Sequence, residues 1–129
     1  ILPLLETPLE DLMLACVEQR LDKMPPIRWK SGACVCVVMA SGGYPGDYPK
    51  GKVISGISQA ETLGATVFHA GTQLRDNQIL TDGGRVLGVT AMGETFDNAI
   101  ASCYTAVDCI EFEGKYYRRD IGHRVQDKR

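Results

Sequence analysis

The chain is organised around residues 39–52, Met-Ala-Ser-Gly-Gly-Tyr-Pro-Gly-Asp-Tyr-Pro-Lys-Gly-Lys. From Ser41 to Lys52 this stretch contains four glycines, two prolines, two tyrosines, one aspartate and two lysines. Glycine lets the backbone bend or approach a ligand closely, and proline restricts φ, so such a loop is both open and stiff. A loop of this kind after an apolar strand is a candidate for the mouth of a binding site, although a plain surface turn explains the same composition.

The apolar segments on either side of this loop predict the strands. Residues 33–40 read Ala-Cys-Val-Cys-Val-Val-Met-Ala, which is typical of a strand that is buried on both faces. Residues 66–81 predict a hairpin that turns at 75–78, and a second turn at 82–85 leads to a strand over 86–92. Together these segments predict an antiparallel meander. Residues 52–57 are a possible short strand, and 58–63 a loop or single helical turn that Gly64 would end.

Helical patterns stand at the two ends of the chain. Thr7 is the expected cap of the first helix, with Pro8 at its first position, Glu10 completing a capping box and an apolar stripe that ends near Leu21. Thr95 is the expected cap of a second helix, whose apolar residues recur from position 96 to 110. Residues 115–119 predict a final strand or extended segment. This order predicts an α+β fold.

The composition excludes several classes of protein. The chain has 129 residues, 44% of them hydrophobic and 23% charged, as in one ordinary globular domain. Its formal net charge is −2 and no basic run is present, so we expect neither nucleic acid nor a membrane surface as a partner. No apolar stretch reaches the roughly 18–20 residues that span a bilayer, and no signal peptide is visible. Residues 126–129 are expected to be a solvated tail.

The cysteines and histidines favour a reducing compartment without a zinc site. Five cysteines, an odd number, are present without a Cys-x-x-Cys pair, in apolar surroundings that predict reduced and mostly buried thiols. Cys34 and Cys36 are expected to share one face of a strand. The two histidines, His69 and His123, lie in unrelated segments, which argues against zinc. His69 is interpreted as closing a strand, with a catalytic role as the less favoured alternative.

Three segments contain residues that are typical of phosphate-binding or anion-binding sites. Residues 46–52 match the first seven positions of a phosphate-binding loop, but Val53 replaces the hydroxyl residue and the next segment is strand-like rather than helical, so we reject that motif. The turn at 82–85, Asp-Gly-Gly-Arg, can aim backbone N–H groups and an arginine at an anion, or be a plain hairpin turn. Residues 116–123 can complete an anion site or form an edge strand with surface charges.

Four linked motifs identify a resemblance to a known family. They occur in order at residues 40–48 (Ala-Ser-Gly-Gly-Tyr-Pro-Gly-Asp-Tyr), 67–72 (Val-Phe-His-Ala-Gly-Thr), 83–90 (Gly-Gly-Arg-Val-Leu-Gly-Val-Thr) and 117–123 (Tyr-Arg-Arg-Asp-Ile-Gly-His). The chain resembles the C-terminal part of the phosphoribosylamine–glycine ligases (glycinamide ribonucleotide synthetases) of purine biosynthesis, over essentially its whole length.

The resemblance implies an activity and a division of the chain. Enzymes of this family join glycine to 5-phosphoribosylamine, using ATP through a glycyl phosphate intermediate. ATP and Mg²⁺ or Mn²⁺ would be held mainly by an ATP-grasp region upstream. Residues 1–32 would be the end of that region, and residues 33–129 the C-terminal domain, a small mostly antiparallel sheet with a flanking helix (rudiment single hybrid motif-like). The missing initiator Met and the apolar opening also lead us to expect a piece of a longer, cytoplasmic protein.

The resemblance also implies which residues line the substrate site. The family places a glycine-rich loop and a Gly-Gly-Arg turn at the phosphoribosylamine and phosphoryl-transfer region, which here correspond to Ser41, Gly42, Gly43, Tyr44, Pro45, Lys50, Gly83, Gly84 and Arg85. Arg85 is the expected anion contact, because similar ATP-grasp enzymes place a C-terminal-domain arginine at the substrate. We expect no catalytic or metal-binding residue in this chain, so the chain alone should be inactive. The alternative is a stand-alone small-molecule-binding or interaction module that reuses the fold.

Overall fold

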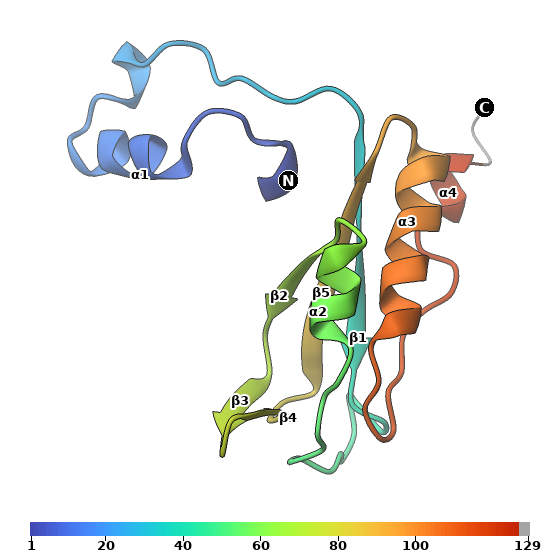
Figure 1. Ribbon diagram of the computed structural model, residues 1–129. Helices are drawn as coiled ribbons and strands as arrows, with labels where there is room; N and C mark the ends of the chain where they lie inside the picture. Colours follow the sequence, from blue (N-terminus) through green and yellow to red (C-terminus); the bar gives the residue numbers. More distant parts are fainter. Residues whose placement is uncertain (127–129) are drawn as a thin grey trace.

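A three-stranded antiparallel sheet is the centre of the computed structural model, which describes residues 1–126 (Figure 1). Its strands lie in the order β1 (Ala33–Ala40), β5 (Arg85–Gly93) and β2 (Thr66–His69). Val89 on β5 pairs with Val37 of β1 on one side and with Val67 of β2 on the other. The strand over residues 33–40 and the mostly antiparallel α+β fold are therefore confirmed.

The hairpin forms a separate two-stranded sheet within the described residues, from β3 (Thr72–Arg75) and β4 (Gln78–Thr81). The turn residues Asp76 and Asn77 have φ values of +48° and +61°, as a tight two-residue hairpin turn requires. The hairpin prediction is confirmed, but the continuous meander is wrong. β5 passes the hairpin and inserts between β1 and β2, because its long and nearly continuous apolar run can be buried in the centre of the sheet, with a strand on either side.

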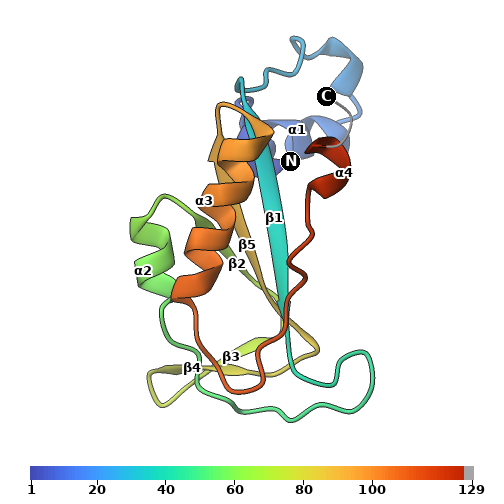
Figure 2. The same ribbon diagram turned by 90° about the vertical axis from the view of Figure 1, so that its right-hand side faces the viewer.

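Two helices cover one face of the sheet. α3 (Phe96–Cys109) packs on β1 and β5, and α2 (Ile57–Thr62) lies beside it over β2 (Figure 2). The hydroxyl of Thr95 accepts a hydrogen bond from the Asn98 amide at 3.2 Å, so the predicted cap is confirmed. Gly64, with φ +89°, follows the end of α2 as predicted. The core between helices and sheet consists mainly of small and branched side chains: Ala99, Cys103, Ala106 and Val107 of α3 against Val35, Val37 and Val89.

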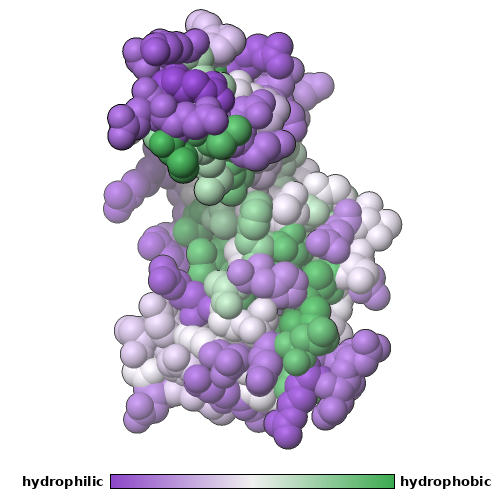
Figure 3. Space-filling view, turned by 90° about the vertical axis from the view of Figure 1, so that its left-hand side faces the viewer, coloured by the Kyte–Doolittle hydropathy of each residue, from purple (hydrophilic) through white to green (hydrophobic). Residues whose placement is uncertain are grey.

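The opposite face of the sheet carries no α-helix in the described residues, and only the start of the chain, Ile1, Leu2 and Pro3, borders it near Cys34 and Cys36. On that face Val38 is 46% exposed and Phe68 39% exposed, and Cys36 is also exposed. Figure 3 shows hydrophobic residues gathered on this side, below the N-terminal segment. The prediction that β1 is buried on both faces is therefore wrong, because the chain supplies a helical layer to one face only. Cys34 and Cys36 do share one face, where they line a cavity with Phe68.

The N-terminal segment lies beyond one end of the sheet (Figure 1). It contains η1 (Leu2–Leu4), α1 (Leu9–Val17) and η2 (Leu21–Lys23). The helix exists as predicted, but Thr7 does not cap it, because its hydroxyl accepts a hydrogen bond from the Arg28 amide at 2.8 Å. The helix also ends before the predicted Leu21, because the chain turns at Gln19, whose φ is +53°. The assignment of residues 1–32 to another domain stays a prediction.

Three smaller predictions are corrected. Residues 52–57 form no strand; only Val53 and Ser55 make isolated bridges, to Leu80 and Glu111. The thiols are mostly not buried: Cys103 is buried, whereas the other four are exposed or intermediate, since most lie outside the helix–sheet interface. The short helix α4 (His123–Gln126) was not predicted, and it contains the first residue of the expected solvated tail; residues 127–129 lie outside the described residues. In residues 1–126 no helix is both long and apolar enough to cross a membrane.

Candidate functional site

The glycine loop and the Gly-Gly-Arg turn are joined at one end of the sheet. The Ser41 amide donates to the Gly84 carbonyl at 2.8 Å, and the Ser41 hydroxyl donates to the Gly83 carbonyl, also at 2.8 Å. Ser41 is only 4% exposed, so its hydroxyl is committed to this link rather than to a ligand. The two bends thus form one structural unit.

The ring of Tyr44 lies directly against Gly84. A Cβ atom at position 84 would stand only 2.0 Å from the Tyr44 Cδ2 atom, so glycine alone allows this approach. The ring also packs edge-on against Tyr48, with 6.1 Å between the ring centroids. Tyr44 and Gly84 therefore lie side by side, which makes the two bends one wall.

A cavity of about 540 Å³ opens beside this wall on the bare side of the sheet. Tyr44, Gly84 and Arg85 line it together with apolar residues of the sheet, Val38, Phe68 and Gly88. Arg85 is exposed and makes no ion pair with any residue in 1–126, so its guanidinium is available to an anion. The cavity therefore combines an aromatic and aliphatic floor with the guanidinium of Arg85, which has no ion-pair partner among the described residues.

Four of the expected site residues lie elsewhere in the loop. Gly42 packs against the Gly114 carbonyl, which a Cβ would approach to 2.8 Å, and Gly43 has φ +99° in the turn of the loop itself. Lys50 forms an exposed ion pair with Asp82 at 3.2 Å. Together with Pro45, these residues are absent from the lining of the 540 Å³ cavity. They shape or flank the loop, and their role toward a substrate stays a prediction.

Sequence reasoning missed the contribution of β2 to this cavity. Phe68, His69, Ala70 and Gly71 all line it, because β2 pairs with β5 next to the Gly-Gly-Arg turn. The Gly71 amide donates to the Arg85 carbonyl at 2.8 Å, and a Cβ at Gly71 would stand 2.5 Å from the Gly83 Cα. The sequence did contain a signal for this contact. The motifs Val-Phe-His-Ala-Gly-Thr and Gly-Gly-Arg each contain a glycine, and these glycines, Gly71 and Gly83, lie where the two backbones come close together.

The third candidate segment, residues 116–123, borders the same loop on its other side. Ala40 and Tyr116 exchange two backbone hydrogen bonds, at 2.7 and 2.9 Å. Arg118 forms a two-pronged ion pair with Asp120, which lowers the pKa of that carboxyl and raises the pKa of the guanidinium. Of the expected edge strand, the structure forms one isolated bridge, between Ala40 and Tyr116. The charged side chains that follow Tyr116 line a second cavity.

Neither a metal centre nor a phosphate loop is formed by the residues that the structure describes. No group of three or more His, Cys, Asp or Glu side chains in residues 1–126 is arranged to hold a metal ion. After Gly46–Lys52 the chain forms isolated bridges at Val53 and Ser55, and the next helix in sequence, α2, begins at Ile57 rather than directly after the loop.

Comparisons with known proteins agree with the motifs. The model of the phosphoribosylglycinamide synthetase C domain matches residues 34–124. A phosphoribosylamine–glycine ligase of Nostoc is 66% identical over 97% of this chain, which covers 30% of that relative. A trifunctional purine biosynthetic protein adenosine-3 of Gallus gallus is 49% identical over 97% of this chain and 12% of its own length.

A solved structure supports the same conclusion. The crystal structure of the phosphoribosylamine–glycine ligase of Thermotoga maritima matches with a TM-score of 0.70 and 35% identity, over 85% of this chain and 27% of that one. The chain thus spans about a third or less of the relatives that it matches. Since the family model covers most of the sequence, this chain belongs to the family of the phosphoribosylglycinamide synthetase C domain.

Proposed function

We propose that this chain is the C-terminal part of an ATP-dependent ligase that joins glycine to 5-phosphoribosylamine and gives glycinamide ribonucleotide for purine biosynthesis. The observation that carries the proposal is the 66% identity, over 97% of the chain, to a protein named phosphoribosylamine–glycine ligase. The joined loop and turn support it, because they form one wall of a cavity with a free arginine, as a subsite for a charged substrate requires.

In this proposal the chain binds and orients a substrate but does not complete the catalytic site. Arg85 contacts an anionic group of the substrate or of the transferred phosphoryl group, and Tyr44 covers the apolar floor beside it. The bond between Ser41 and Gly83 keeps both bends in place, so that Arg85 meets the substrate without prior rearrangement. Gly42, Gly43, Pro45 and Lys50 shape the loop that carries Tyr44.

ATP, the metal ion and the remaining substrate contacts belong, in this proposal, to the rest of the ligase chain. The described residues offer no set of side chains for Mg²⁺ or Mn²⁺, so no step of the reaction is assigned to a metal on this chain. We further propose that the ligase acts in the cytoplasm, where its thiols remain reduced.

The proposal is tested with the intact protein that contains this chain. Purified protein should release ADP only when glycine, phosphoribosylamine and ATP are all present, and the 129-residue chain alone should give no product. Arg85→Ala should lower kcat/KM at least about tenfold, because a charge-assisted hydrogen bond to the substrate is lost. Arg75→Ala, which removes an exposed arginine of the hairpin, is the matched control. An intact protein without ligase activity would overturn the proposed reaction, and an unchanged rate for Arg85→Ala would overturn the role of Arg85.

A further inference from the structure

A second cavity, of about 740 Å³, lies along the C-terminal segment and has no assigned role. It is lined by Lys115, by the run from Tyr116 to Asp120, and by His123. Three permanent positive charges therefore meet one carboxylate in its lining. Such an excess of cations around a concave surface favours an anion.

Arg119 is the cation in this cavity that the protein leaves for a ligand. Arg118 is engaged by Asp120, and Lys115 by the Glu111 carboxylate at 2.6 Å and the Ile110 carbonyl at 2.9 Å. Arg119 instead lies over the ring of Tyr117, with its Cζ atom 5.1 Å from the ring centroid, and makes no ion pair within residues 1–126. Stacking orients a guanidinium without using its N–H donors, so all of them remain available.

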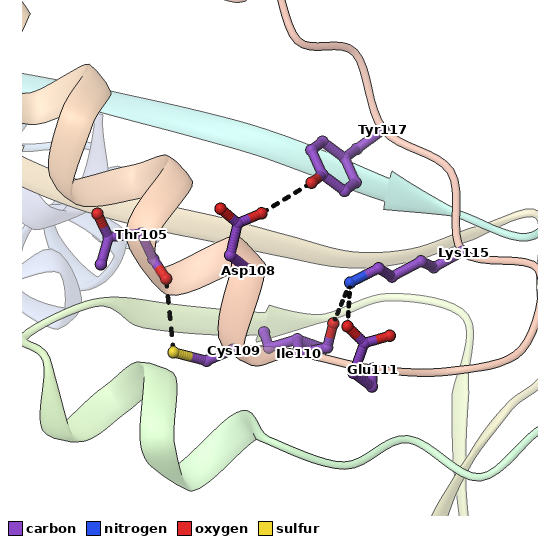
Figure 4. Close-up of polar contacts among 7 residues, drawn as sticks. All are labelled: Thr105, Asp108, Cys109, Ile110, Glu111, Lys115 and Tyr117. Carbon is purple, nitrogen blue, oxygen red and sulfur yellow. Dashed lines mark hydrogen bonds and ion pairs between the residues drawn. The ribbon is translucent and has the colours of Figure 1, made fainter.

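The wall of this cavity is held rigidly from behind by α3. The Tyr104 hydroxyl donates to the Arg118 carbonyl at 2.7 Å and accepts from the Ile121 amide at 3.1 Å. The Tyr117 hydroxyl donates to Asp108 at 2.9 Å, and Figure 4 shows it reaching from the segment toward α3. Burial, together with the hydrogen bond to Asp108, raises the pKa of Tyr117, so the phenol keeps its proton and this contact. The arginines are thus preorganised rather than carried on a mobile tail.

The cavity also adjoins the glycine loop of the proposed substrate site. Tyr116 pairs with Ala40 at the start of the loop, and Gly114 lies against Gly42 so closely that a Cβ at Gly42 would approach its carbonyl oxygen to 2.8 Å. The loop therefore has Arg85 on one side and the segment bearing Arg119 on the other.

We propose that this second cavity binds a phosphate-class dianion, the phosphate end of the phosphoribosyl substrate, with Arg119 as its main contact. This assignment rests on the proposed ligase function. Arg119 suits a phosphate-class anion, because its planar guanidinium can donate two parallel N–H bonds to phosphate oxygens while Lys115 and Arg118 are already paired with Glu111 and Asp120. The volume lies within the range of roughly 300–1,000 Å³ usual for small-molecule sites. A phosphate of ATP has the same chemistry, so the experiment has to separate these two sources.

The test compares Arg119→Ala and Arg119→Lys with Arg75→Ala in the intact protein. Arg119→Ala should raise the KM for phosphoribosylamine about tenfold to a hundredfold, while the KM values for ATP and glycine stay within about twofold. Binding of ribose 5-phosphate, measured by calorimetry, should weaken by a similar factor, and unphosphorylated ribose should bind poorly to every variant. Arg119→Lys should fall between the wild type and Arg119→Ala, because the charge remains without the planar fork.

Several outcomes would overturn the assignment. Unchanged ribose 5-phosphate binding in Arg119→Ala, with thermal unfolding as in the wild type, would show that the phosphate binds elsewhere. A raised KM for ATP alone would assign the cavity to the nucleotide.

A failure of the proposed ligase function can be told apart from a failure of the phosphate subsite. If the intact protein does not make the ligase product but still binds ribose 5-phosphate through Arg119, the proposed function fails while the phosphate subsite stands.

Discussion

Gly84→Ala tests the contact on which the candidate site depends. The new Cβ would stand 2.0 Å from the Tyr44 Cδ2 atom, and real Cβ contacts are essentially never shorter than 3.0 Å, so the ring must move by at least about 1 Å. Overpacking of this kind costs about 1–3 kcal/mol, and the stiffer unfolded chain of alanine returns about 0.4–1 kcal/mol. We therefore expect a net loss of about 1–2 kcal/mol in the free energy of unfolding by urea.

A nearby glycine, Gly88 on β5, separates this clash from a general effect of alanine. A Cβ at Gly88 would lie 3.4 Å from the Cys36 Sγ atom and 3.8 Å from the Phe68 Cβ atom, which are ordinary contacts. Gly88→Ala should therefore change stability by less than about 0.5 kcal/mol. In a Tyr44→Ala background the clash is absent, so Gly84→Ala should cost almost nothing, with a coupling of about 1–2 kcal/mol between the two positions.

Gly84→Ala should also impair function in the intact ligase. Displacement of the Tyr44 ring alters the wall next to Arg85, and we expect kcat/KM to fall about tenfold, since positioning on the scale of 1 Å affects rates strongly. Equal urea curves for Gly84→Ala and Gly88→Ala, or additive effects of Gly84→Ala and Tyr44→Ala, would refute the reasoning that the ring and the turn form one wall.

Three further predictions concern the fold itself. Thr95→Ala should cost about 1 kcal/mol in urea unfolding, because it removes the bond that caps α3; no change would contradict the cap. Gly56→Ala should cost more than about 2 kcal/mol by the same measurement, since φ is +85° and the new Cβ would stand 1.8 Å from the Cys109 carbonyl oxygen; near-wild-type stability would be inconsistent with this turn. Burial raises the pKa of the Cys103 thiol from 9.0 to about 11, so the folded state binds this proton more tightly than the unfolded chain does. Its contribution to stability should be full below about pH 9 and lost as the pH rises through about 11, and Cys103→Ala should remove this part of the pH dependence of urea midpoints; identical pH profiles would exclude it.

Local elements were predictable because their signals lie within a few residues. The apolar run Ala33–Ala40 has the bounds of β1, and Thr95 caps α3 as expected. Asp76 and Asn77 supply the turn of the β3–β4 hairpin. Thr7 shows the limit of such reasoning: its residue type fits a cap, yet its hydroxyl binds the amide of Arg28, a partner that is 21 residues away. A local pattern cannot rank a local partner against a distant one.

The candidate site was predictable only in part. The sequence motifs singled out Tyr44, Gly84 and Arg85, and these lie together as expected. The motifs did not separate them from Gly42, which packs on the C-terminal segment instead. Nor did they show that Phe68 contributes to the same cavity, because this depends on β2 pairing with β5 rather than with its neighbour in sequence.

The sequence by itself determined where β1 and α3 begin, which family the motifs resemble and which glycines are needed at bends, since hydrophobic periodicity and turn chemistry act between near neighbours. Only the tertiary structure decided that β5 lies between β1 and β2, that one sheet face has no α-helical layer in residues 1–126, and that Arg118 but not Arg119 pairs with a carboxylate of this described part. These outcomes depend on which distant segments bury the most apolar surface and satisfy the most polar groups together, and that competition involves the whole chain at once.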